Sequence, residues 1–152
     1  MGNIFNSDFQ DFISALNKAE VKYVLVGGYS VIYHGFPRTT GDLDIFVEVT
    51  KENYEKLCKA FDLFQLPVFD MTEENFLSNK ELTVFTFGRA PVSIEILKVI
   101  SGVSFQEVYK NCITTNFEGV DLKIINLSDL RKNKAASNRP KDQNDLENLL
   151  GR

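Results

Sequence analysis

The feature that most restricts the fold is a short, continuous apolar run that ends in two glycines. The run is Tyr23–Val26, and Gly27 and Gly28 follow it directly. Apolar residues in succession, without polar alternation, are typical of a strand that is buried on both faces of a sheet. The glycines are expected to end this strand, and a short helix over residues 29–33 follows, with Gly35 as its stop.

The remaining apolar patterns predict a mixed α/β (α+β) fold, in which a mixed β-sheet is flanked by helices. A length of 152 residues is typical of one domain. We therefore expect a single domain over residues 1–152, with a core of about residues 1–126 and a short helical tail of about residues 127–152. Helices are expected over residues 7–19, 29–33, 50–61, 104–109, from 128 and over 140–150, with a short one from 72. Strands are expected over residues 23–26, 42–49, 81–87, 92–99, 113–117 and 120–125.

Composition excludes several kinds of protein. The formal net charge is −4, which is incompatible with a uniformly basic nucleic-acid-binding surface. His34 is the single histidine, so zinc sites with several histidines are excluded. Cys58 and Cys112 are far apart and are expected to be buried thiols in a reducing compartment. The chain has neither an apolar run long enough for a membrane span nor a signal peptide, so it is expected to be cytoplasmic.

The segment Asp42-Leu43-Asp44 places two acids two residues apart on an expected strand. Residues i and i+2 of a strand point to the same face, so the two carboxylates project side by side. Two like charges this close repel each other unless a cation lies between them, and hard oxygen ligands suit Mg²⁺. The alternative is a pair of exposed acids at the edge of a sheet.

Glu95 interrupts the apolar strand expected over residues 92–99. It either faces solvent or, if its strand lies beside that of Asp42, joins the acid pair as a third carboxylate. Three carboxylates can hold two metal ions about 4 Å apart, an arrangement that favours in-line attack at phosphorus.

A basic segment without acids runs from Arg131 to Lys141. Arg131 and Lys132 are expected to lie on a solvated helix face. Lys134, Arg139 and Lys141 fall at the junction of two helices, where they are better placed to contact phosphates. Asp142 follows them, and it is expected to stabilise the last helix or to pair with Arg139 or Lys141.

Together these segments resemble the DNA polymerase beta-like nucleotidyltransferase superfamily. Val26-Gly27-Gly28, thirteen further residues, and Asp42-Leu43-Asp44-Ile45 match its glycine turn and acidic strand. Ile94-Glu95-Ile96 matches its third acidic motif, and the stretch from Lys134 to Asp145 is similar to the late motifs of small prokaryotic members, the minimal and abortive-infection toxin-like nucleotidyltransferases.

The resemblance implies a role for each of these residues. Asp42 and Asp44 would ligate two Mg²⁺ ions, with Mn²⁺ as the alternative, and Glu95 would hold the catalytic metal and activate the acceptor hydroxyl. The residues implied to bind the nucleotide are Gly27, Gly28, Ser30, Lys134, Arg139 and Lys141. Arg38 would either reach a phosphate or brace Asp42. His34 is expected to close the short helix rather than to act as a base.

The implied activity is Mg²⁺-dependent transfer of a nucleoside monophosphate from an NTP to an acceptor hydroxyl. The acceptor is an RNA 3′ end, a partner protein or a small molecule, and a role in toxin–antitoxin or defence systems is plausible. One alternative is a catalytically inactive module that binds a nucleotide or a partner on the same fold. A glycosyltransferase that uses Asp42 and Asp44 for a metal–nucleotide sugar normally needs a longer chain. The residues predict no oligomeric state.

Overall fold

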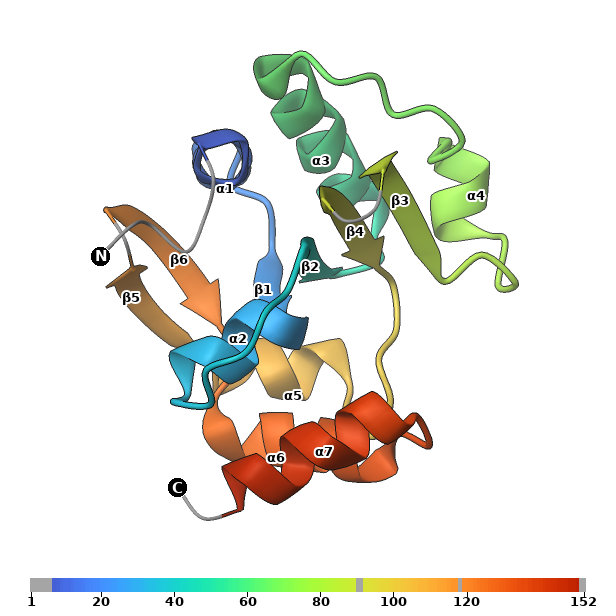
Figure 1. Cartoon of the computed structure of the whole chain (residues 1–152). Helices are drawn as coiled ribbons and strands as arrows, with labels where there is room; N and C mark the ends of the chain where they lie inside the picture. Colours follow the sequence, from blue (N-terminus) through green and yellow to red (C-terminus); the bar gives the residue numbers. More distant parts are fainter. Residues whose placement is uncertain (1–6, 90–91, 118, 151–152) are drawn as a thin grey trace.

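The computed structural model describes residues 7–89, 92–117 and 119–150 (Figure 1). Its helices are α1 (Ser7–Lys18), α2 (Gly27–Tyr33), α3 (Lys51–Phe64), α4 (Glu73–Leu77), α5 (Phe105–Lys110), α6 (Leu127–Ala136) and α7 (Pro140–Leu149). Its strands are β1 (Tyr23–Val26), β2 (Asp42–Val47), β3 (Val84–Arg89), β4 (Val92–Leu97), β5 (Ile113–Phe117) and β6 (Val120–Ile124). The mixed α/β class and the order of elements agree with the sequence prediction. The predicted turn residues Ala90, Pro91 and Glu118 and the last-helix residue Gly151 lie outside the described residues.

The strands form one mixed sheet in the order β3-β4-β2-β1-β6-β5. Strand β2 is antiparallel to β1 and parallel to β4, so it lies between them in the middle of the sheet. The prediction that the strand of Glu95 lies beside that of Asp42 is therefore confirmed. Both predicted hairpins are also present, because β3 pairs with β4 and β5 pairs with β6 in antiparallel fashion.

Strand β1 is buried on both faces, as its sequence predicts, and its residues alternate between two hydrophobic clusters. Tyr23 and Leu25 belong to the cluster that contains α1 and α3 residues such as Phe12. Val24 and Val26 belong to the cluster on the opposite face, which contains residues of α5, α6 and α7. In Figure 1 these two groups of helices lie on opposite sides of the sheet.

Some element boundaries differ from prediction. Helix α3 begins after the predicted cap Thr50, whose hydroxyl accepts from the Asn53 amide at 3.1 Å, but it continues to Phe64 rather than Phe61. Its extra turn packs the Phe64 ring against Phe12, with the two centroids 5.3 Å apart. Strand β2 ends at Val47, two residues early, because the Asn53 side chain bonds the carbonyl of Glu48 at 2.8 Å. Strand β3 begins later than predicted, at Val84.

None of the helices in the described ranges is long and apolar enough to cross a membrane.

Candidate active site

Three acids from neighbouring strands meet on one face of the sheet. Asp42 and Asp44 lie on β2, and the parallel register of β2 and β4 sets Asp44 opposite Glu95. Because side chains two residues apart on a strand share a face, Asp42 and Asp44 point the same way. All three acids line a cavity of about 130 Å³, to which the junction of α6 and α7 contributes Lys134, Arg139 and Lys141. We call it the acidic cavity.

Asp44 is the most perturbed of the three acids. Burial, the adjacent Glu95 carboxyl group and the charge of Asp42 raise the pKa of Asp44 to about 8, and the nearby ammonium group of Lys134 opposes this only in part. Its Oδ1 atom is buried without a hydrogen-bond donor. Two ionised carboxylates offer each other no donor, so Asp44 and Glu95 share a hydrogen bond only when one of them holds a proton.

Asp42 has a fixed partner that sequence reasoning missed. Its Oδ1 accepts a hydrogen bond of 2.6 Å from the hydroxyl of Ser93, which is its register partner on β4. Ser93 is buried, and its two-residue spacing from Glu95 puts both side chains on the same face. The spacing of Ser93 and Glu95 can be read from the sequence. Predicting the contact of Ser93 with Asp42 also requires the register of β2 against β4, which the sequence does not give.

The donor set fits a hard divalent cation by its chemistry. Carboxylate oxygens are the ligands that Mg²⁺ prefers. The buried Oδ1 of Asp44 accepts no hydrogen bond, so a bound cation would satisfy it. Among the described residues, however, no three acid, histidine or cysteine side chains are already spaced as a metal centre. Cation binding at Asp42, Asp44 and Glu95 therefore requires small side-chain movements.

The two glycines are explained by close packing. Gly27 has a φ of +71°, and a Cβ atom there would lie 1.9 Å from Oδ2 of Asp44. A Cβ atom on Gly28 would lie 2.5 Å from Oγ1 of Thr40. Both residues line the acidic cavity, so only glycine lets this turn pack against the acidic strand and the loop before it. Helix α2 begins at Gly27 itself, two residues earlier than predicted.

Two residues near the turn have structural roles. The hydroxyl of Ser30 donates to the Gly27 carbonyl at 2.6 Å, and the side chain is fully buried. Ser30 is not among the residues that line the acidic cavity, and its hydroxyl is taken up by this bond inside α2, so its role in nucleotide binding stays a prediction. His34 is the C-cap of α2, and its Nε2 bonds the Ile125 carbonyl at 2.7 Å, which agrees with the helix-closing role.

A buried network of ion pairs closes the cavity on the helical side. Lys134 is 4% exposed, and its Nζ lies 2.7 Å from Oδ1 of Asp142 and 3.1 Å from Oδ2 of Asp145. Burial opposes ionisation of Asp142, but hydrogen bonds from Lys134, Ser137 and Arg139 outweigh it and lower the pKa of Asp142 to about 2. Lys134 therefore lines the cavity while two acids hold it in place.

Arg38 lines the acidic cavity and is held there by Asp145. Its Nε lies 2.9 Å from Oδ1 of Asp145, and its Nη2 donates to Oδ2 of the same residue at 3.1 Å. Asp145 is fully buried and pairs with both Arg38 and Lys134, so it ties the loop before β2 to α6 and α7. Sequence reasoning gave Asp145 no role, although the spacing of Asp142, Asp145 and Leu149 marks one buried face of α7.

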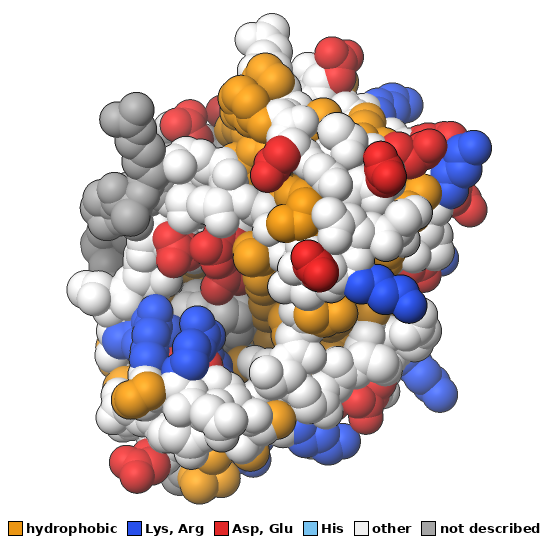
Figure 2. Space-filling view, turned by 90° about the vertical axis from the view of Figure 1, so that its right-hand side faces the viewer, with side chains coloured by type: hydrophobic (Ala, Val, Ile, Leu, Met, Phe, Trp, Pro, Cys, Tyr) orange, Lys and Arg blue, Asp and Glu red, His pale blue; other side chains and the backbone are white. Residues whose placement is uncertain are grey.

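Arg139 and Lys141 are exposed cations at the mouth of the cavity. Arg139 also donates to Oδ2 of Asp142 at 2.7 Å, which confirms one predicted pairing, and this hydrogen bond raises the pKa of Arg139. Figure 2 shows acidic and basic side chains facing each other across a hollow, which agrees with the lining of the acidic cavity. Lys132 is half exposed and pairs with Glu107 at 3.4 Å, as expected for a solvated helix face.

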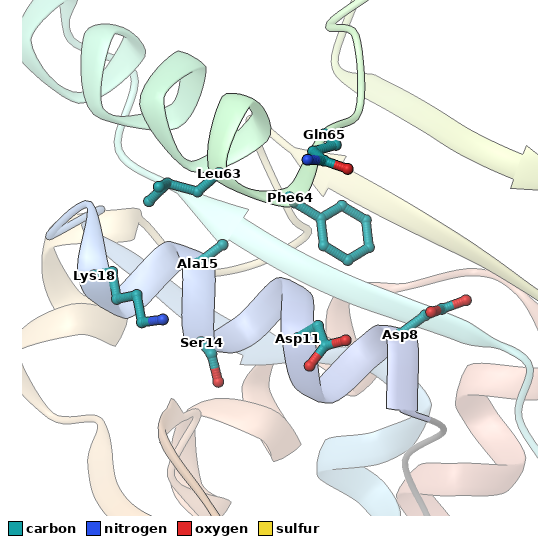
Figure 3. Close-up of a pocket in the computed structure, with 8 residues that line it drawn as sticks. All are labelled: Asp8, Asp11, Ser14, Ala15, Lys18, Leu63, Phe64 and Gln65. Carbon is teal, nitrogen blue, oxygen red and sulfur yellow. The ribbon is translucent and has the colours of Figure 1, made fainter.

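A separate cavity lies between α1 and α3, on the other side of the sheet (Figure 3). Its lining includes Asp8, Asp11 and Lys18 of α1 and Leu63 of α3. None of the three acids of the acidic cavity lines it, so it does not belong to the same site.

Comparisons with known proteins agree with the fold. The family described as "Nucleotidyltransferase of unknown function (DUF6036)" matches the chain over residues 7–150. No curated protein sequence matches it. The crystal structure of an antigenic nucleotidyltransferase-like protein from Paracoccidioides brasiliensis superimposes with a TM-score of 0.51 at 14% sequence identity, covering 96% of this chain and 76% of that one. At this identity the likeness shows a shared fold.

Proposed function

The chain belongs to the DUF6036 family of nucleotidyltransferases of unknown function, and from this premise we propose that it is an active, Mg²⁺-dependent enzyme. It would transfer a nucleoside monophosphate from an NTP to an acceptor hydroxyl and release pyrophosphate. The main support for this proposal is the buried Oδ1 atom of Asp44, which accepts no hydrogen bond. Asp42, Glu95 and Lys134 line the same cavity as Asp44. Perturbed carboxyl groups that converge in one cavity are typical of functional sites.

Bound Mg²⁺, as one or two ions, would supply charge neutralisation at the α-phosphate, and Mn²⁺ has the same preference for these oxygens. Asp42, Asp44 and Glu95 would be its ligands. Glu95, which lies on β4, would also accept the proton of the attacking hydroxyl.

The cations at the α6/α7 junction would bind the rest of the nucleotide. Arg139 and Lys141 are exposed at the cavity mouth, where a triphosphate can reach them. Lys134 is fixed by Asp142 and Asp145, so it would stabilise phosphate charge without moving. Gly27 and Gly28 line the same cavity without side chains and would let the phosphates approach the backbone.

The test is transfer of label from each [α-³²P]NTP in the presence of Mg²⁺ to total RNA, protein or small molecules of a cell extract. We expect label in one acceptor class, release of pyrophosphate, and loss of both in the Asp42→Asn/Asp44→Asn variant. Binding of NTP by the unmodified chain without any pyrophosphate release would instead identify a catalytically inactive binding module. A toxin–antitoxin or defence role and a location in the cytoplasm are part of this proposal and rest on the resemblance.

A further inference from the structure

An apolar cavity of about 640 Å³ lies past the ends of β2 and β4. It is bounded by the segment before β3 and by α5. Its lining includes eight hydrophobic residues: Phe46, Val47, Val49, Leu77, Val99, Ile100, Val103 and Phe105. Phe46 follows Asp44 by two residues on β2, so both side chains project from the same face of the strand.

A middle cavity of about 200 Å³ adjoins both the apolar cavity and the acidic cavity. The middle cavity shares Gly27, Asp44 and Leu97 with the acidic cavity, and Val99 and Ile100 with the apolar one. Figure 2 shows hydrophobic side chains on the surface beside the hollow. The three cavities thus adjoin one another, and we call this row of cavities the groove.

The groove changes in chemistry along its length. Arg139 and Lys141 stand at the acidic end, whereas the apolar cavity has two cations in its lining, Lys80 and Lys98. The ammonium group of Lys98 already donates to the carbonyls of Asn75 and Asn79, at 2.9 and 3.0 Å. Among the described residues of this lining, a phosphate backbone would meet mostly hydrophobic walls, the Glu48 carboxylate and the cation Lys80, which makes a nucleic acid a poor occupant.

The geometry points to an acceptor subsite: we propose that the apolar cavity binds the uncharged, hydrophobic body of a small hydroxylated acceptor. This inference rests on the proposed function. A cavity of this size and lining is typical of small-molecule sites. The acceptor oxygen would form a bond to the α-phosphorus as the bond to pyrophosphate breaks. Pyrophosphate would leave with the electron pair, and the hydroxyl proton would pass to the Glu95 carboxylate.

The probe is 2-naphthol, whose fluorescence reports binding and whose hydroxyl can take label from [α-³²P]NTP. Val49→Glu/Val99→Glu introduces charge into the cavity at positions that are 37% and 59% exposed, so folding should survive. The matched control is Leu63→Glu, at a residue that is 50% exposed and lines the cavity between α1 and α3. We expect saturable naphthol binding, at least tenfold weaker binding by the double variant, and no change in the control.

With NTP and Mg²⁺, naphthol should become labelled in competition with a short oligoribonucleotide that carries a free 3′ hydroxyl. Absence of saturable naphthol binding, or equal binding by the double variant, would overturn the subsite whatever the labelling shows. Label that enters the oligoribonucleotide alone, with no inhibition by naphthol, overturns it too. Naphthol binding as expected, with no label in any acceptor, contradicts the proposed function and leaves the cavity as a site for apolar ligands, so the two failures are distinguishable.

Discussion

Asp44 and Glu95 occupy the same register position of the parallel strands β2 and β4, with Val26 of β1 on the other side of Asp44. This pairing brings two acids that are 51 residues apart in the chain to one point of a sheet whose central strands are otherwise mostly apolar. The first two predictions follow from the unfavourable burial of Asp44 beside another carboxyl group.

Substitution of Asp44 by Asn should abolish nucleotidyl transfer while the fold persists. Asn keeps the shape of the side chain but removes the charge that a divalent cation needs, and such a loss corresponds to several kcal/mol of transition-state stabilisation, or roughly a thousandfold in rate. The measurement is pyrophosphate release, with circular dichroism as the control for folding. Activity within tenfold of the unmodified chain would exclude Asp44 as a metal ligand.

The stability of the metal-free protein should fall as the pH rises from about 4 to 8. The pKa of Asp44 is about 8 in the fold and 3.8 in the unfolded chain, so between these values the folded state holds a proton that the unfolded state does not. Stability therefore decreases with pH over this window, and levels off above it. Thermal unfolding at a series of pH values tests this.

Mg²⁺ offers a second readout of the same group. Because the cation competes with the proton on Asp44, it should raise the unfolding temperature more at pH 9 than at pH 6. The Asp44→Asn variant should show neither the pH-dependent loss nor the Mg²⁺ effect. An equal Mg²⁺ effect in this variant would place the cation elsewhere.

The sequence predicted these acids and the pair of Arg139 with Asp142, but not the other ion pairs that face them. The pattern of Asp42, Leu43 and Asp44 fixes which side chains share a face, because a strand has a period of two. The partners of Lys134 and Arg38 depend on how α7 packs against the loop before β2, which no local pattern encodes. Asp145 lies at the centre of that contact and is fully buried. Its spacing from Asp142 and Leu149 was the available signal, since buried faces of helices repeat at this interval.

Ser30 shows what spacing in the sequence leaves open. A hydroxyl three residues after a glycine turn fits the nucleotide-binding pattern, but the same spacing lets it bond the Gly27 carbonyl within the helix. Sequence spacing alone does not distinguish these outcomes, because both place the hydroxyl one turn from the glycine.

Removal of the Lys134 ammonium group should destabilise the protein strongly. Lys134→Met keeps the aliphatic stem but leaves Asp142 and Asp145 buried without their shared cation, and breaking a buried ion pair in this way costs about 3–5 kcal/mol. The matched control is Lys132→Met on the same helix, because Lys132 is half exposed and its pairs with Glu107 and Asp129 should contribute less than about 1 kcal/mol. Urea unfolding of both variants gives the comparison, and similar losses for the two would refute the role of the network.

Gly27→Ala should impair cation binding more than a comparable substitution elsewhere. Gly27 and Gly119 both have positive φ angles, +71° and +83°, so alanine introduces similar backbone strain at each, about 1–2 kcal/mol. A Cβ atom at Gly119 meets nothing within 4 Å, whereas one at Gly27 would lie 1.9 Å from Oδ2 of Asp44. Gly119→Ala therefore measures strain alone, and any further loss in Gly27→Ala reports displacement of the Asp44 carboxylate. We expect both variants to lose stability, but only Gly27→Ala to lose the Mg²⁺-dependent rise in unfolding temperature. A full Mg²⁺ response in Gly27→Ala would show that Asp44 tolerates the displacement.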